Sequence, residues 1–327
     1  MILKNNKIYR NIFSGYIVYI IIGLINLISI PIYVKIIGVE NYSLIGFFIV
    51  LQSFIGLFDF GLTPSLIRKI SFYKTKSIND FRTAEVIFIF FSILSLFFIF
   101  IISENYFFEF FNNDNKTNRK LLLLAFCLSL SLKFQENIYK APFFGYQKIE
   151  EYNYFLVIYN ILRVSITIFL ISTFNQKLLV FFVTFSSLSA IYILLLKIFI
   201  NKKFFFKKKV KFVFNRKIMI ETNAFSTFIF LNSLVTVIIT QLDKVLLANN
   251  VSKQDFSYFI ISNNLAYYIL IAVTPITVTL FPKFSQLFQE KKFSELKKIF
   301  INSSEVVGLF IIPGSIILYL SSEIFLK

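Results

Sequence analysis

Long apolar runs constrain this chain more than any other feature of its sequence. The nine runs, each rich in Ile, Leu and Phe, cover residues 12–34, 41–67, 84–102, 121–144, 153–173, 178–200, 218–248, 257–281 and 301–320. About 20 helical residues cross the ~30 Å hydrocarbon core of a bilayer, so these runs can span it. Because lipid offers no partner to backbone polar groups and the runs lack strand-like alternation, we predict an all-α, polytopic transmembrane helical bundle of nine spans.

Composition narrows the chemistry that the chain can perform. Hydrophobic residues make up 57% of the 327 residues and charged residues 16%, unlike a soluble domain. There is no His, and the single Cys, Cys127, lies in the Leu-rich run 121–144. We therefore expect no metal site, no cofactor and no thiol chemistry, and we interpret Cys127 as a packing residue.

Lys and Arg are distributed unequally between alternate connections. Starting from residue 1, one set of connections holds 22 of the 34 Lys and Arg residues, whereas the opposite set holds seven. Since these residues accumulate in cytoplasmic loops, we predict a cytoplasmic N-terminus. The basic, Phe-rich loop 201–217 favours an interfacial segment on the inner leaflet, and no nucleic-acid partner is expected.

Ionisable side chains inside the apolar runs distinguish a transporter from a simple anchor, because each costs about 2.5–3.5 kcal/mol at the centre of a membrane helix. In the run 121–144, Lys133, Glu136, Asn137 and Lys140 recur at the spacing of one helix face. Such a face must contact other helices or water.

Two further runs carry polar faces of the same kind. Their residues are Asn153, Asn160, Arg163 and Thr167 in the run 153–173, and Glu221, Asn232, Thr236, Thr240 and Asp243 in the run 218–248. Lys244 points about 100° away from Asp243. We expect the three faces to converge on one hydrated cavity with a cationic excess. The alternative is that Glu136 pairs with Lys133 or Lys140, and Asp243 with another basic residue, only to hold helices together.

The second run ends in LFDFGLTPSLIRKIS at 57–71, where Asp59 lies about 12 Å before the cytoplasmic exit. Gly61 and Pro64 follow, and we predict that they bend or loosen the helix near the acid. Broken helices at membrane depth are tolerated where they line a cavity. Asp59 is then either a gating or ion-coupling group, or a cap on the broken helix end.

Three stretches resemble the O-antigen and capsule flippases, the Wzx-type members of the multidrug/oligosaccharidyl-lipid/polysaccharide (MOP) exporter superfamily. They are IPIYVKIIGVENYSLIGFFIVLQSFIGLFDFGLTPSLIRKIS at 30–71, APFFGYQKIEEYNYFLVIYNILR at 141–163 and ITQLDKVLLANNVSKQDFSYFIISNNLAYYI at 239–269. The resemblance implies a two-lobe, MATE-like architecture with a six-helix lobe at 1–200, a basic cytoplasmic linker at 201–217 and a partial lobe of three helices at 218–327. The family's last three spans have no counterpart before Lys327, which indicates a fragment of a longer protein or a truncated gene product.

The resemblance further implies a flippase of the bacterial inner membrane, and not an enzyme. Its substrate would be undecaprenyl-diphosphate-linked oligosaccharide, moved from the cytoplasmic to the periplasmic leaflet by alternating access. Its other partners would be membrane lipids, a coupling proton or cation, a polysaccharide polymerase and a chain-length regulator. The candidates for substrate binding are Lys133, Lys140, Arg163, Asn160 and Asn137. The candidates for ion coupling or gating are Asp59, Glu136, Asp243, Lys244 and Pro64.

Two other functions stay open at this point. A multidrug or cation-coupled exporter of the same superfamily would need an anionic cavity for cationic drugs, which the three basic candidates disfavour. A membrane-embedded polysaccharide polymerase or ligase would carry a large external loop. The longest external loop here, 103–119, has only 17 residues, which disfavours this function.

Overall fold

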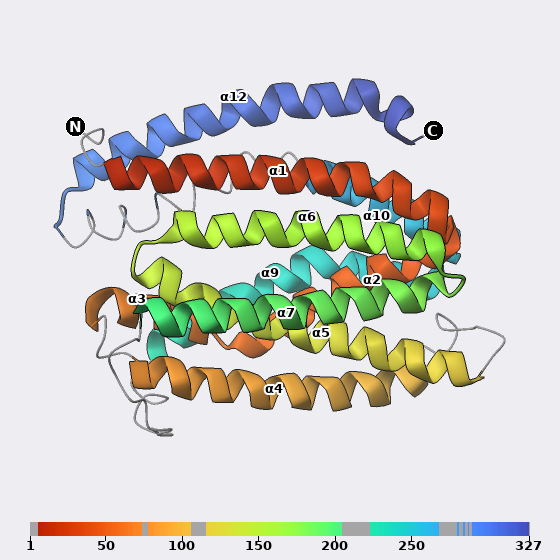
Figure 1. The fold of residues 1–327 in the computed structure, drawn as a ribbon. Coiled ribbons are helices and arrows are strands. Elements are labelled where there is room, and N and C mark those ends of the chain that lie inside the picture. Colours follow the sequence, from red (N-terminus) through yellow and green to blue (C-terminus); the bar gives the residue numbers. More distant parts are fainter. Residues whose placement is uncertain are drawn as a thin grey trace. The chain divides into compact units, whose positions relative to one another are not determined.

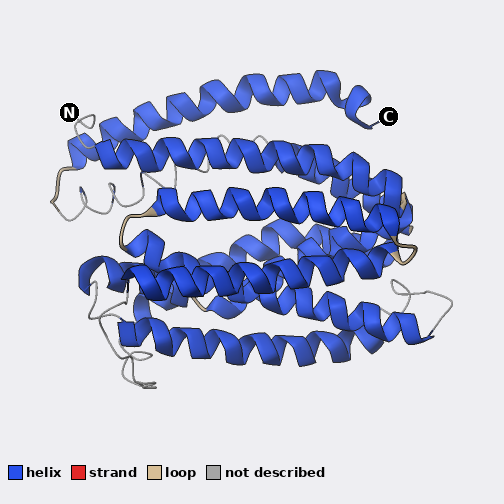
Figure 2. Cartoon of the chain, in the orientation of Figure 1, coloured by secondary structure: helices blue, strands red, loops and turns tan. Residues whose placement is uncertain are grey.

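The computed structural model describes residues 6–73, 78–105, 116–204, 223–267 and 290–326, together with Leu280, Phe284 and Leu287. Within these residues every regular element is a helix, as Figure 2 shows. The elements are α1 (Asn6–Ile37), α2 (Val39–Ile55), η2 (Gly56–Asp59), α3 (Leu62–Tyr73), α4 (Ile78–Asn105), α5 (Lys116–Gly145), α6 (Ile149–Thr173), α7 (Lys177–Phe204), α9 (Asn223–Asn250), α10 (Lys253–Tyr267) and α12 (Phe293–Leu326). The predicted all-α bundle is confirmed.

Seven helical segments among the described residues are long and apolar enough to cross a membrane. They are Ser14–Ile37, Val39–Asp59, Arg119–Gly145, Ile149–Thr173, Lys177–Phe204, Thr227–Ala248 and Phe293–Ile317. The protein is therefore a multi-pass membrane protein. Helix α4 contains the predicted run 84–102, and α10 covers the first part of the run 257–281, of which 268–279 and 281 lie outside the described residues. The count of nine spans stays a prediction.

The second predicted run, 41–67, is broken near its acidic residue, as the sequence predicted. Helix α2 passes into the short 3-10 helix η2, and the chain then turns through Phe60 and Gly61, whose φ angles are 47° and 72°. Glycine adopts this left-handed region without the steric penalty that a Cβ atom brings. Pro64 lies in the first turn of α3, where a backbone N–H has no partner within the helix, so its missing donor leaves the helix intact.

The chain divides into two compact units. Unit 1 contains Met1–Pro31, Ile149–Asn160 and Tyr258–Lys327, and unit 2 contains Ile32–Lys148 and Ile161–Ser257. In unit 2, α5 packs against α2, α3, α4 and α7, and α4, α5 and α7 run side by side in Figure 1. Helix α9 packs against α2, η2 and α3. The lobe boundaries predicted from the sequence, 1–200, 201–217 and 218–327, stay a prediction.

Aromatic rings form much of the core of unit 2. Phe48 of α2 contacts Phe126 of α5 and Phe182 and Phe185 of α7, with ring centroids 5.1–5.6 Å apart. The pairs with Phe126 and Phe185 are edge-to-face, an arrangement that adds to the stabilisation that burial provides. Cys127 is fully buried beside Phe126, which agrees with its interpretation as a packing residue.

Helices α3 and α5 approach each other closely at Gly145. A Cβ atom built on Gly145 would lie 2.6 Å from both Cβ and Cγ2 of Ile70, and 3.2 Å from the carbonyl oxygen of Ile67. Side-chain atoms do not approach this closely, so only glycine allows the present packing. This contact fixes α3, and with it the helix break, against the end of α5.

Candidate functional site

The polar face predicted in the run 121–144 lies on one continuous helix, α5. The Lys133 ammonium forms an ion pair with the Glu136 carboxylate, and Lys140 Nζ donates to Asn137 Oδ1 at 3.5 Å. Glu136 is buried and Lys133 is partly buried. The pairing of Glu136 with Lys133, which the sequence left as one of two options for this acid, is the arrangement present in the structure.

Asp59, the last residue of η2, lies at the helix break and interacts with the polar face of α5. Its Oδ1 accepts a hydrogen bond of 2.8 Å from the backbone N–H of Thr63, in the first turn of α3. Asp59 therefore caps α3, the second of the two roles considered for it. Its carboxylate also attracts the ammonium of Lys140, so the acid lies in the electrostatic field of α5.

We call Asp59, Lys133, Glu136, Asn137 and Lys140 the α5 charge cluster. It contains two carboxylates and two lysines, all in a unit formed by membrane-spanning helices. Lys133 forms an ion pair with Glu136, whereas Lys140 donates to Asn137 and is attracted electrostatically by Asp59. An anionic ligand would therefore have to compete with these carboxylates for the lysines.

The polar face of α6 packs against other helices. The Arg163 guanidinium lies over the ring of Phe185 of α7, with its Cζ 5.1 Å from the ring centroid. Thr167 Oγ1 lies 3.4 Å from Thr184 Oγ1, also on α7. These contacts place Arg163 at the aromatic core of unit 2.

The two asparagines of the same face belong to unit 1. The Asn160 amide donates to the carbonyl oxygen of Leu156 at 2.8 Å, and the Asn153 amide donates to Ser14 Oγ of α1 at 3.1 Å. The face is thus divided between the two units at residue 160. Its convergence with the polar face of α5 stays a prediction.

Helix α9 gives Asp243 and Lys244 different surroundings, as expected from the ~100° between neighbouring residues of a helix. The Lys244 side chain is buried and donates to the carbonyl oxygen of Thr240, whereas the Asp243 side chain is 49% exposed. Lys244 Nζ and Asp243 Oδ1 are 4.0 Å apart. Thr240 precedes Lys244 by four residues and lies on the same helix face, so the lysine side chain runs back along its own helix. Glu221 lies outside the described residues.

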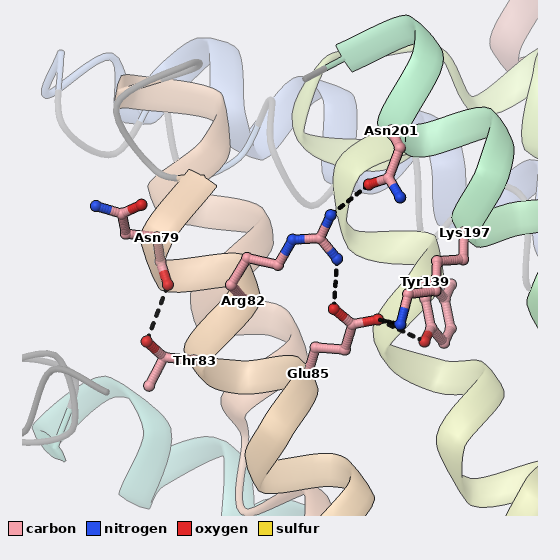
Figure 3. A network of polar contacts seen from close by, with 7 residues as sticks. All are labelled: Asn79, Arg82, Thr83, Glu85, Tyr139, Lys197 and Asn201. Carbon is pink, nitrogen blue, oxygen red and sulfur yellow. Dashed lines mark hydrogen bonds and ion pairs between the residues drawn. The ribbon is translucent and has the colours of Figure 1, made fainter. Parts of the chain in front are cut away.

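A second polar network escaped the sequence analysis. Figure 3 shows Glu85 of α4 at its centre. Glu85 Oε2 lies 2.6 Å from Arg82 Nη1, and Glu85 Oε1 lies 2.8 Å from Lys197 Nζ of α7 and accepts a hydrogen bond of 2.8 Å from the Tyr139 hydroxyl of α5. Arg82 also donates to Asn201 Oδ1 of α7. One buried carboxylate thus links three helices.

This network joins the N-terminal end of α4 to the C-terminal parts of α5 and α7. Spans that alternate in direction bring these ends to the same side of the membrane, which we predict to be cytoplasmic. Arg82 and Glu85 share one face of α4 at the i, i+3 spacing, but no periodicity indicates their partners on α5 and α7. The available signal was the pair of opposite charges, Glu85 and Lys197, inside two apolar runs. Within the described residues, no group of three or more Cys, Asp or Glu side chains could hold a metal ion.

The chain resembles one known protein family in sequence and several solved transporters in structure. A family model described as "Polysaccharide biosynthesis protein" matches residues 8–288. No curated protein matches the chain. The structure described as "Crystal structure of MATE in complex with MaD5" superposes with a TM-score of 0.65 at 12% identity, over 98% of this chain and 74% of that one. The structure described as "Inward-facing conformation of a multidrug resistance MATE family transporter of the MOP superfamily" gives 0.60 at 14% identity, over 95% and 74%. At such identities the likeness shows a shared fold.

Proposed function

Because the chain belongs to the polysaccharide biosynthesis protein family and has the fold of MATE transporters of the MOP superfamily, we propose that it moves a lipid-linked oligosaccharide across the bacterial inner membrane. The substrate we propose is undecaprenyl-diphosphate-linked oligosaccharide, an O-antigen or capsule repeat unit, which passes from the cytoplasmic to the periplasmic leaflet. The observation that carries the proposal is the α5 charge cluster, which places lysines and carboxylates together inside membrane-spanning helices.

The lysines of the cluster suit the diphosphate of such a substrate. An ammonium group is a compact charge that binds phosphate oxygens, and the hydrogen bonds between charged partners are stronger than neutral ones. In this proposal the diphosphate replaces Glu136 as the partner of Lys133 and Asn137 as the partner of Lys140. Asn137, Asn160 and Arg163 complete the set of binding candidates, and the lipid tail stays in the bilayer.

The carboxylates couple transport to a proton or cation. Protonation of Asp59 or Glu136 removes the charge that competes with the diphosphate, so it favours substrate binding. Deprotonation returns the lysines to the carboxylates and favours release. The membrane potential contributes about 2.3 kcal/mol per elementary charge per 100 mV to such a cycle. Pro64 at the helix break and the neighbouring Asp243 and Lys244 on α9 are the remaining candidates for gating.

The double variant Lys133→Gln and Lys140→Gln tests substrate binding. In a bacterium that lacks its own flippase and expresses this protein in full, we expect the variant to lose surface polysaccharide while lipid-linked repeat units accumulate inside the cell. The control is Lys120→Gln, which removes an exposed lysine from the same helix. Unchanged surface polysaccharide in the double variant would refute the proposed binding role. Loss of resistance to cationic dyes, with normal polysaccharide, would instead identify a multidrug exporter.

Two variants of Asp59 separate its capping role from its charge. Asp59→Ala removes the hydrogen bond to Thr63 and should destabilise the protein by about 0.5–2 kcal/mol. Asp59→Asn keeps an acceptor for that bond and should be much closer to the parent in stability. Reaction of Cys127 with a thiol-reactive dye during heating measures both, since this cysteine is buried and is the sole one in the chain. We expect Asp59→Asn to fold yet to lose coupled transport, and full transport by this variant would reduce Asp59 to a cap.

A further inference from the structure

The last turns of α7 carry an apolar face that ends in lysine. Ile191, Leu194, Leu195 and Ile198 are exposed, and they recur at the i, i+3, i+4 and i+7 spacing of one helix face. Lys202 follows Ile198 by four residues, so it continues this face, and it is exposed as well. An apolar stripe on a membrane-spanning helix thus ends at a cation.

The neighbouring lysine is supported by an aromatic platform. Lys203 Nζ lies 5.1 Å from the ring centroid of Phe199, and Phe199 stacks on Phe143 of α5 at 5.7 Å. Phe143 also contacts Phe204, with ring centroids 5.4 Å apart. Lys148 Nζ lies 5.5 Å over the ring of Phe204. Cation–π contacts of this kind hold ammonium groups beside the platform without removing their charge.

We propose that Ile191, Leu194, Leu195, Ile198, Lys202 and Lys203, which we call the α7 lipid surface, bind one anionic phospholipid. An acyl chain lies along the apolar stripe, and the phosphate accepts hydrogen bonds from the two ammonium groups. The alternative is that these lysines only complement the negative end of the α7 dipole, because both stand in its last turn. That alternative explains neither the exposed stripe nor its continuation into Lys202.

Binding at this surface would also stabilise the network around Glu85. Asn201 accepts a hydrogen bond from Arg82 and directly precedes Lys202, and Lys197 lies about one turn earlier on the same helix. A phospholipid that holds the last turn of α7 therefore holds the residues that bridge α7 to α4. In this proposal, lipid occupancy therefore adds to the stability of these helices.

The experiment measures lipid retention by native mass spectrometry and thermal stability through Cys127. The full chain is purified and supplied with phosphatidylglycerol or phosphatidylcholine of the same acyl chains. We expect the protein to retain one phosphatidylglycerol and to melt at a higher temperature with this lipid. Lys202→Gln with Lys203→Gln should weaken retention about thirtyfold, since each lysine near an anionic headgroup strengthens binding roughly fivefold. Ile198→Ser, which keeps both charges, should weaken retention as well.

The matched control is Lys297→Gln with Lys298→Gln, which removes two exposed lysines from α12. This control should retain the phospholipid, and so should Lys202→Arg with Lys203→Arg. Equal retention by the parent and the Lys202 and Lys203 glutamine variant would overturn the proposal. So would an equal loss in the α12 control, which would show a general effect of charge. Stabilisation by soluble glycerol phosphate equal to that by the lipid would assign the surface to a free anion.

Discussion

Replacing Glu85 by Ala is expected to destabilise the protein by roughly 3–5 kcal/mol, because the change removes one partner of a buried ion pair. Glu85 is buried, and its two carboxylate oxygens face Arg82 and Lys197. Without the carboxylate, two cations remain close together and the Tyr139 hydroxyl loses its acceptor. The Arg82 contact accounts for most of the effect, since Lys197 is more exposed and solvent screens its charge.

Thermal labelling of Cys127 in detergent measures this loss. A second variant tests the cause: Lys197→Met removes one of the cations that Glu85→Ala leaves behind. The double variant should therefore lose less stability than the sum of the two single variants. The control, Glu305→Ala, removes an exposed carboxylate from α12 and should change stability by less than about 0.5 kcal/mol. If Glu85→Ala melts like this control, the network does not stabilise the fold.

Gly145→Ala is expected to destabilise the protein by about 1–3 kcal/mol, although alanine has the higher helix propensity. The added methyl group would lie 2.6 Å from Cβ and Cγ2 of Ile70, and its third neighbour is the backbone oxygen of Ile67, which cannot rotate away. Helix α3 must move off α5 to relieve the clash. Because α3 begins just after Asp59, the same movement should disturb the α5 charge cluster and reduce transport.

Two comparisons make this prediction specific. Ile70→Ala should fail to restore stability to Gly145→Ala, because the Cβ atom that remains at residue 70 is itself 2.6 Å away. Gly308→Ala in α12, where nothing lies within 4 Å of the added Cβ, should be neutral or slightly stabilising. A Gly145→Ala protein that is as stable as the parent would show that α3 and α5 are not held at this distance.

The candidate site shows which features can be predicted from residue spacing within a single helix. Lys133, Glu136, Asn137 and Lys140 were recognisable because one helix repeats every 3.6 residues, so their spacing alone places them on one face. The break after Asp59 was recognisable from Gly61 and Pro64. Asp59 was assigned to two possible roles; the hydrogen bond from Thr63 shows the capping contact, and ion coupling by Asp59 stays a proposal.

The partners of charged groups on different helices were not recognisable in this way. Arg163 of α6 lies over Phe185 of α7, and Glu85 of α4 contacts Tyr139 of α5 and Lys197 of α7. No periodicity within one helix encodes such a meeting.

Apolar run length and charge distribution were enough to establish helices, membrane insertion and the polar face of α5, because each depends on the chain's interaction with lipid and water one segment at a time. The pairing of charges, the close approach at Gly145 and the aromatic core were decided only by the folded protein. These contacts depend on which helices become neighbours, and that choice follows from the combined packing of many side chains that are distant in the sequence.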